Sequence, residues 1–282
     1  MYIDFSKILE FGWREFLFDW QQLVGAFFGA LIPILFSLYL FRKDTREKRK
    51  KNLQSSEIFL AHTISDLIET KAELAFFIMR LEHTINEIKR SDNKTYIVSA
   101  TNFPSYKNEF DINIVKIDIP SIYLANKMLI CYSLLRDTCS QIEYFREEFN
   151  RTVDRNYQII NAYKDPSRGV GISVKDQNQL YLNQLIAIRD VVKNVILDQN
   201  LTTTLRSFIT ARMVFLKYCS NFRTFHRYYL EGIFGKRALK DNGQEVIESK
   251  LRDKVDAEMV DCEKEYKDRL DVYIQANPQA LF

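Results

Sequence analysis

The longest apolar run of the chain covers residues 23–41. None of these nineteen positions is charged, and only Ser37 and Tyr39 carry a polar side-chain group. At about 1.5 Å per residue the run would form about 29 Å of helix, which matches the hydrocarbon core of a bilayer. The pattern therefore predicts a transmembrane helix over residues 21–41.

A basic cluster follows the apolar run directly. Residues 42–51 contain seven basic side chains and two acidic ones, Asp44 and Glu47. Because basic residues stay on the cytoplasmic side of a membrane, residues 42–52 are predicted to form a juxtamembrane flank. The predicted location is the cell (inner) membrane, crossed once, with the N-terminus outside and the C-terminal domain in the cytoplasm. The basic flank residues are Arg42, Lys43, Arg46, Lys48, Arg49, Lys50 and Lys51.

Residues 1–20 mix apolar and charged positions. Trp13 and Trp20 accompany Phe, Ile and Leu residues among Asp, Lys, Glu and Arg. Tryptophan favours the headgroup level of a membrane. We therefore expect an interfacial amphipathic helix, and the alternative is that these residues form the first turns of the membrane helix itself.

The clearest soluble helix covers residues 53–90, which contain neither Gly nor Pro. Leucine recurs there every seven residues, and a second row, mostly isoleucine but including Lys71, alternates with it. This spacing is typical of a parallel coiled coil. The flanking positions, however, carry Ala, Ile, Thr and Phe, which widens the apolar stripe to that of a globular bundle. Both a bundle helix and a zipper between chains remain open. The predicted oligomerisation residues of this segment are Leu53, Leu60, Ile64, Leu67, Leu74, Ile78, Leu81 and Ile85.

The rest of the chain is also predicted to be helical. Helices are expected over residues 121–163, 175–198, 201–231 and 244–275. Residues 91–121 contain two prolines, which exclude helix around them, and rows of β-branched residues. The fold class is therefore mainly α: an N-terminal transmembrane helix, then a cytosolic bundle of long, coiled-coil-like helices over residues 53–282. A short extended or β insertion is expected near residues 91–121.

The distribution of charge limits what the basic residues can mean. The whole chain has a net charge of +3, whereas residues 42–51 alone carry a surplus of five positive charges. The remainder is slightly acidic, so overall charge gives no support to nucleic-acid binding. The four cysteines include no closely spaced pair, which fits free thiols in a reducing compartment.

Residues 206–240 are nevertheless basic, with eight Lys or Arg against one acid, Glu231. In the helix predicted there, aromatic residues repeat every seven positions from Phe208, and the arginines share another face. Three interpretations remain open: an aromatic core seam with a solvated basic back, a face that binds a polyanion or an acidic protein, and a helix resting on anionic lipid. The candidate anion-binding residues are Arg206, Arg212, Lys217, Arg223 and Arg227.

Motifs of catalysis and cofactor binding are missing from the sequence. Its three histidines are scattered, and it has neither an HExxH motif nor a CxxC pair, so no zinc site is expected. It also lacks a Gly-rich phosphate loop and a GxSxG elbow. We expect no cofactor, and the sequence speaks against catalysis without excluding an active site assembled from distant residues.

The membrane segment itself contains a motif for self-association. Gly25 and Gly29 have the small-xxx-small spacing that lets two membrane helices approach closely. Counting back from Leu53 in sevens places Gly25 in the same row. The expected partners are the lipid bilayer, further copies of the chain, and a cytosolic protein or polyanion on the basic face within residues 206–240.

These features predict a single-pass, homo-oligomeric helical protein that acts without catalysis. The favoured function is a membrane-perturbing or pore-forming effector controlled by its cytosolic domain, of the kind found in prokaryotic antiviral defence. One alternative is a membrane-bound adaptor or signal transducer that tethers a cytosolic partner or nucleic acid. The other is a nuclease or nucleotide hydrolase with an unrecognised helical active site.

Overall fold

The computed structural model describes residues 5–91, 103–104, 122–163, 173–220 and 241–278. These residues are almost entirely helical and include no strand, so the mainly α fold class is confirmed for them. The insertion predicted near residues 91–121 lies outside the described residues, apart from its first residue and positions 103–104. The chain divides into two compact units, Met1–Lys51 and Asn52–Phe282, and each is described by itself.

The first helix, α1, extends from Phe5 to Arg90 and contains Pro33. It includes three segments that the sequence pattern predicts as separate elements, namely residues 5–20, 21–41 and 53–90. The basic flank between them is helical as well, because Lys, Arg and Glu are good helix formers. Thr45 also fits the helix, since its hydroxyl donates to the carbonyl oxygen of Phe41 at 2.8 Å.

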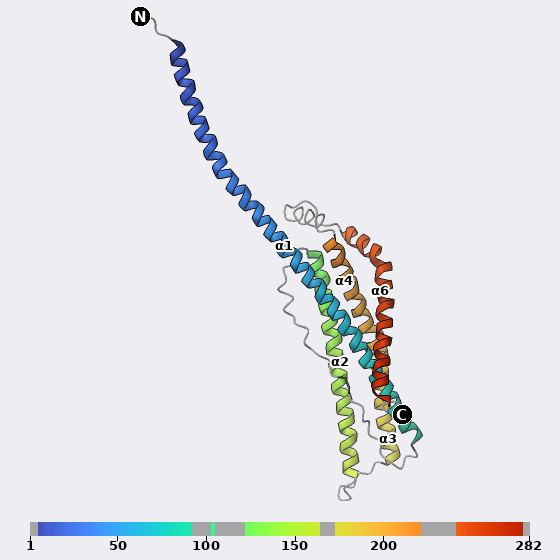
Figure 1. Cartoon of the computed structure of the whole chain (residues 1–282). Helices are drawn as coiled ribbons and strands as arrows, with labels where there is room; N and C mark the ends of the chain where they lie inside the picture. The colour runs from blue at the N-terminus through green and yellow to red at the C-terminus, as the bar shows by residue number, and fades with distance from the viewer. Residues whose placement is uncertain (1–4, 92–102, 105–121, 164–172, 221–240, 279–282) are drawn as a thin grey trace. The chain divides into compact units, whose positions relative to one another are not determined.

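The second unit is a bundle built on the C-terminal half of α1 (Figure 1). Its other helices are α2 (Ile122–Tyr163), α3 (Val174–Val191), the π-helix η3 (Val192–Leu201), α4 (Thr202–Ser220) and α6 (Asp241–Ala276). Within this unit α4 contacts both α2 and α6, while α1 contacts α2 through aromatic rings and α6 through ion pairs. The described helices therefore enclose one core, as in other helical bundles.

The core is apolar and strongly aromatic where α1 meets α2. The ring of Phe77 lies 5.1 Å from that of Phe149 in an edge-to-face arrangement and 4.5 Å from that of Phe103. Buried leucines and isoleucines from α1, α3 and η3 continue the core, and α4 adds Phe208 and Phe215. The aromatic row predicted from Phe208 therefore faces the interior as far as the described side chains extend.

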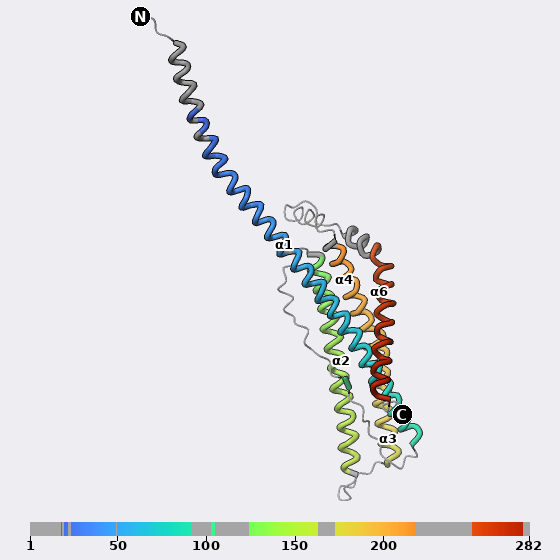
Figure 2. Tube along the Cα trace, viewed as in Figure 1, coloured from blue at the N-terminus to red at the C-terminus, as the bar shows by residue number. Residues whose placement is uncertain are grey.

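The break predicted between a helix at 175–198 and a helix at 201–231 is wrong. The structure has α3, η3 and α4 in direct succession, and Figure 2 traces them as one continuous run. The backbone stays in the right-handed helical region at Val192 (φ −60°, ψ −42°) and at Thr202 (φ −65°, ψ −42°). The i→i+5 bonds of η3 shift the spacing of the buried apolar residues. In a sequence, a shift of this kind looks like the end of one helix and the start of another. Residues 221–231 of the predicted helix lie outside the described residues.

Candidate functional site

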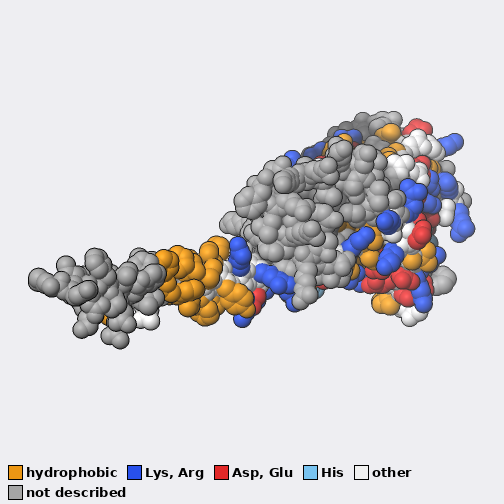
Figure 3. Space-filling view, turned by 90° about the horizontal axis from the view of Figure 1, so that it is seen from above, with side chains coloured by type: hydrophobic (Ala, Val, Ile, Leu, Met, Phe, Trp, Pro, Cys, Tyr) orange, Lys and Arg blue, Asp and Glu red, His pale blue; other side chains and the backbone are white. Residues whose placement is uncertain are grey.

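The described side chains of the apolar stretch of α1 are exposed, except that Leu31 is half-buried. α1 is long and apolar enough to cross a membrane, judged by length and composition, and none of its most apolar window is buried inside the protein. Phe27 and Ile32, for example, are 59% and 61% exposed. Figure 3 shows this stretch as an apolar surface that gives way to Lys and Arg side chains. Such an exposed apolar window differs from the core helix of a soluble protein, which is mostly buried.

The two glycines of this stretch face open space. A Cβ atom added to Gly25 or Gly29 would meet no heavy atom within 4 Å. Both positions therefore leave room for another helix to approach closely, as the small-xxx-small motif requires. Pairing of chains through these glycines stays a prediction.

The basic flank residues are exposed where their side chains are described. The ammonium group of Lys48 lies 2.9 Å from a carboxylate oxygen of Asp44, one turn earlier in the helix. The side chain of Arg49 lies outside the described ones. The other exposed flank residues are Arg42, Lys43, Arg46, Lys50 and Lys51.

The leucine row of α1 is buried inside a single chain. Its eight predicted oligomerisation residues are all 5% exposed or less, and all belong to the core of the bundle. The structure thus places them as the bundle interpretation requires. A zipper between two chains would need this core to open first, so the role of these residues in pairing chains stays a prediction.

Two of the candidate anion-binding residues already have acidic partners. Arg206 of α4 forms an ion pair with Asp256 of α6. Arg212 bridges two helices, because its Nε lies 2.9 Å from Glu57 of α1 and its Nη1 lies 3.2 Å from Glu258 of α6. An external anion would have to compete with these carboxylates.

The structure says less about the other three candidate anion-binding residues. Lys217 is half-buried and takes part in an interaction of its own. Arg223 and Arg227 lie outside the described residues. Polyanion binding by the five predicted residues therefore stays a prediction.

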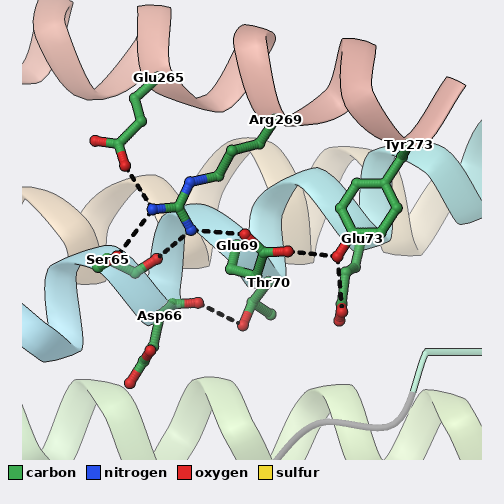
Figure 4. Close-up of polar contacts among 8 residues, drawn as sticks. All are labelled: Ser65, Asp66, Glu69, Thr70, Glu73, Glu265, Arg269 and Tyr273. Atoms are coloured by element: carbon green, nitrogen blue, oxygen red, sulfur yellow. Dashed lines mark hydrogen bonds and ion pairs between the residues drawn. The ribbon is translucent and has the colours of Figure 1, made fainter. Parts of the chain in front are cut away.

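A connected group of polar side chains joins α1 to the C-terminal part of α6 (Figure 4). At its centre the guanidinium of Arg269 donates to the carboxylate of Glu69 at 2.6 Å and to the hydroxyl and carbonyl oxygens of Ser65 at 2.8 and 3.2 Å. It also pairs with Glu265, one turn earlier on α6. The hydroxyl of Tyr273 hydrogen-bonds Glu69 and lies 3.1 Å from a carboxylate oxygen of Glu73. We call these six residues the Arg269 cluster.

The electrostatics of the Arg269 cluster favour a structural role. The hydrogen bond from Tyr273, helped by Arg269 and opposed by partial burial, holds the pKa of Glu69 below its usual value. Burial, the hydrogen bond to Glu69 and the charge of Glu73 raise the pKa of Tyr273. Both groups are thus moved away from neutral pH, where a general acid or base would need to titrate. The hydrogen bonds and ion pairs of the cluster therefore stabilise the packing of α6 against α1.

A buried charge between Glu69 and Glu73 on α1 also links this helix to α6. Lys71 is only 8% exposed, and its ammonium group lies 2.7 Å from Glu263 and 4.7 Å from the centre of the Tyr266 ring. A buried ammonium needs such partners, because an unpaired buried charge is strongly destabilising. The lysine that interrupts the apolar row in the sequence is thus matched by a carboxylate and an aromatic face from α6.

Metal and thiol chemistry find little support in the described part of the chain. Among its residues no group of three or more His, Cys, Asp or Glu side chains is placed to hold a metal ion. Cys131 and Cys262 are buried, and burial raises the pKa of each thiol to about 11. Thiols with such pKa values stay protonated and unreactive at neutral pH.

Sequence reasoning missed the carboxylates and aromatic rings of α6 that meet α1. The residues concerned are about 200 positions apart in the chain, and a single sequence offers no signal for such pairs except Lys71, a charge in an apolar row. No protein-family model, curated protein or solved structure matches this chain.

Proposed function

We propose that this protein is anchored in a membrane by α1 and acts without catalysis, as an oligomer that perturbs the bilayer under the control of its helical domain. The observation that carries the proposal is the exposed apolar stretch of α1, followed directly by the basic flank. The biological setting in prokaryotic antiviral defence stays a prediction.

The energetics of the apolar stretch support insertion into a bilayer. Full burial of a large apolar side chain is worth about 1.5–3 kcal/mol, and residues 24–41 expose many such side chains to solvent. Soluble monomers rarely expose apolar patches larger than a few hundred Å². A hydrocarbon environment removes this penalty. The basic flank orients the helix with residues 42–282 on the cytoplasmic side.

Control by the helical domain is supported by the closed state of the bundle. The leucine row of α1 is occupied by other helices of the same chain, so self-association in this state is left to the membrane segment. Gly25 and Gly29 offer the close approach that such association needs. In this proposal a cytosolic cue changes the bundle, and oligomerisation within the membrane follows.

The membrane anchor is tested first, on the full chain in its expression host. We expect the protein to stay in the membrane fraction after washing at alkaline pH, and a tag at the N-terminus to be accessible only from outside. Release by alkaline washing would exclude the anchor. A protected N-terminal tag would reverse the orientation.

Oligomerisation and leakage are tested with a matched pair of double variants. Gly25→Leu with Gly29→Leu fills the small-residue face, whereas Ala26→Leu with Ala30→Leu adds similar bulk one position further round the helix. In cells where the unchanged chain forms oligomers and causes dye leakage, the glycine variant should lose both, and the alanine variant should keep both. A chain that is monomeric under all conditions would exclude the proposal, and oligomers without leakage would favour the adaptor.

A further inference from the structure

We propose that one side of α1, immediately after the apolar stretch, is a binding face for anionic phospholipid headgroups. We call it the cationic face, and the inference rests on the membrane anchor proposed above. It assigns a lipid class to the flank, which goes beyond its role in orientation. The face consists of Arg42, Lys43, Arg46, Arg49 and Lys50.

The geometry of the helix separates the charges of the flank. The flank lies within α1, and successive residues of an α-helix are rotated by about 100°. On that basis the five residues of the cationic face fall within an arc of about 120°. No acidic residue of the flank shares this arc, so one side of the helix carries five positive charges.

The opposite side of the same segment is close to neutral. It carries two acids, Asp44 and Glu47, and two bases, Lys48 and Lys51. Lys48 and Asp44 already neutralise each other at 2.9 Å. The flank is thus a cationic face backed by a balanced one, rather than a helix surrounded evenly by positive charge.

The depth of the cationic face suits lipid headgroups. Phe41, the last residue of the apolar stretch, is 69% exposed and adjoins Arg42 directly. The face begins about 1.5 Å beyond Phe41 along the helix and ends about 13 Å beyond it. The headgroup region of one leaflet is about 5–8 Å thick, and long basic side chains can extend back towards it. The described side chains of the face are exposed.

The same observations favour lipid over nucleic acid. A polyanion in solution would have to approach this face beside an anionic membrane surface that repels it. The chain outside the flank is slightly acidic and adds no general attraction for nucleic acid. Phosphatidylglycerol is a suitable probe, because it presents one negative charge at the depth of the face.

The experiment uses the full chain in phosphatidylcholine vesicles with a trace of spin-labelled phosphatidylglycerol or spin-labelled phosphatidylcholine. The motionally restricted fraction of each label gives the relative affinity of the protein for that lipid. We expect the anionic label to be preferred about fivefold or more at 0.1 M KCl, the factor expected if at least one basic residue interacts fully with the headgroup. The preference should fall several-fold at 1 M KCl.

Two lysine pairs provide a control matched in charge and chemistry. Lys43→Gln with Lys50→Gln removes two charges from the cationic face, and Lys48→Gln with Lys51→Gln removes two from the balanced side. The first variant should lower the lipid preference about threefold or more. The second should leave it within experimental error. An equal loss in both variants, or no loss in either, would overturn the proposal.

Failure of the lipid face can be told apart from failure of the anchor. If alkaline washing removes the chain from the vesicles, the anchor is wrong and the lipid face falls with it. If the chain is retained without any preference for phosphatidylglycerol, the lipid face alone is wrong. Binding of a fluorescent RNA that is lost in the Lys43 and Lys50 variant, without a lipid preference, would assign the face to nucleic acid instead.

Discussion

Two helices of the bundle, α2 and α6, are attached to their neighbours by different forces. The buried residues of α2 are mostly apolar and include Phe149 and Leu135. From residue 250 on, α6 fully buries only Leu251, Val255 and Cys262. The half-buried Met259, Tyr266 and Leu270 add apolar contacts to the core, and ion pairs and hydrogen bonds connect α6 to α1 and α4. Salt screens exposed and half-exposed ion pairs and so weakens them, whereas it does not screen apolar contacts.

This difference teaches that the bundle need not open as one unit. Local opening free energies range from near zero to that of global unfolding, and segments with few apolar contacts lie at the low end. We therefore expect α6 to detach before α2 does. The native thiols report on both helices, because Cys131 lies in α2, Cys262 lies in α6, and each has a pKa raised to about 11. Their labelling rates, resolved by mass spectrometry, reflect opening rather than intrinsic reactivity.

The largest effect should come from the apolar side of the comparison. Phe149→Ala removes a ring that is 1% exposed and that contacts Phe77 and Phe103. We expect the free energy of unfolding to fall by about 3–5 kcal/mol, measured by denaturant unfolding of the full chain in detergent. Labelling of Cys131 should accelerate as well. A loss below about 1 kcal/mol would mean that α2 is not held by its aromatic contacts.

Removal of the central arginine of α6 should have a smaller and more local effect. Arg269→Ala leaves Glu69 and Glu265 without their shared partner. Labelling of Cys262 should accelerate about fivefold, which corresponds to a local loss of about 1 kcal/mol, while labelling of Cys131 should change far less. Arg151→Ala is the control, because Arg151 pairs only along its own helix, with Glu147 and Glu148, among the described ion pairs. Equal acceleration at both cysteines would show that the bundle opens as a whole.

Salt should separate the two helices without any substitution. Raising KCl from 0.1 to 1 M shortens the Debye length from about 10 to 3 Å and weakens the ion pairs of Arg206 and Arg269. Labelling of Cys262 should accelerate about twofold to threefold, since exposed pairs contribute a few tenths of a kcal/mol each. The rate at Cys131 should stay constant. A salt-independent rate at Cys262 would mean that apolar contacts hold α6.

The smallest effect should appear in acid. The pKa of Glu69 is lower in the folded protein than its ordinary value of 4.5, mainly through the hydrogen bond from Tyr273. The contribution of Glu69 to the packing of α6 is therefore complete above pH 4.5. It is lost as the pH falls through the lower pKa that Glu69 has in the folded protein. Hydrogen exchange in α6 should accelerate in that range more than exchange in α2. Glu69→Gln should remove this part of the pH dependence, and an unchanged profile would exclude Glu69 as its source.

The sequence predicted the apolar contacts of the bundle better than its polar ones. A helix expected over residues 121–163 is observed at Ile122–Tyr163, and one expected over 244–275 is observed at Asp241–Ala276. The row from Leu53 is buried, as a bundle helix requires. Such features follow from local periodicity, which a single sequence contains.

The partners of Arg269 and Arg212 could not be predicted in this way. Ion pairs between distant segments leave no periodic trace, and the arginines of α4 looked like a free basic face until Asp256, Glu57 and Glu258 were placed beside them. The membrane segment is the opposite case. Its length and composition mark it in the sequence alone, and the structure adds that none of its most apolar window is buried among the described residues.

The π-helix η3 provides one position where the chain can change in length without changing the bundle. Its i→i+5 bonds take up one more residue per bond than the i→i+4 bonds of α3 and α4. Loss of one residue from a π turn returns that turn to the α pattern, and the helices on either side keep their faces towards α2. The same deletion inside α4 would rotate every following side chain by about 100° and turn Phe215 out of the core. Relatives of different length could therefore share this core, with the difference absorbed inside a helix rather than between helices.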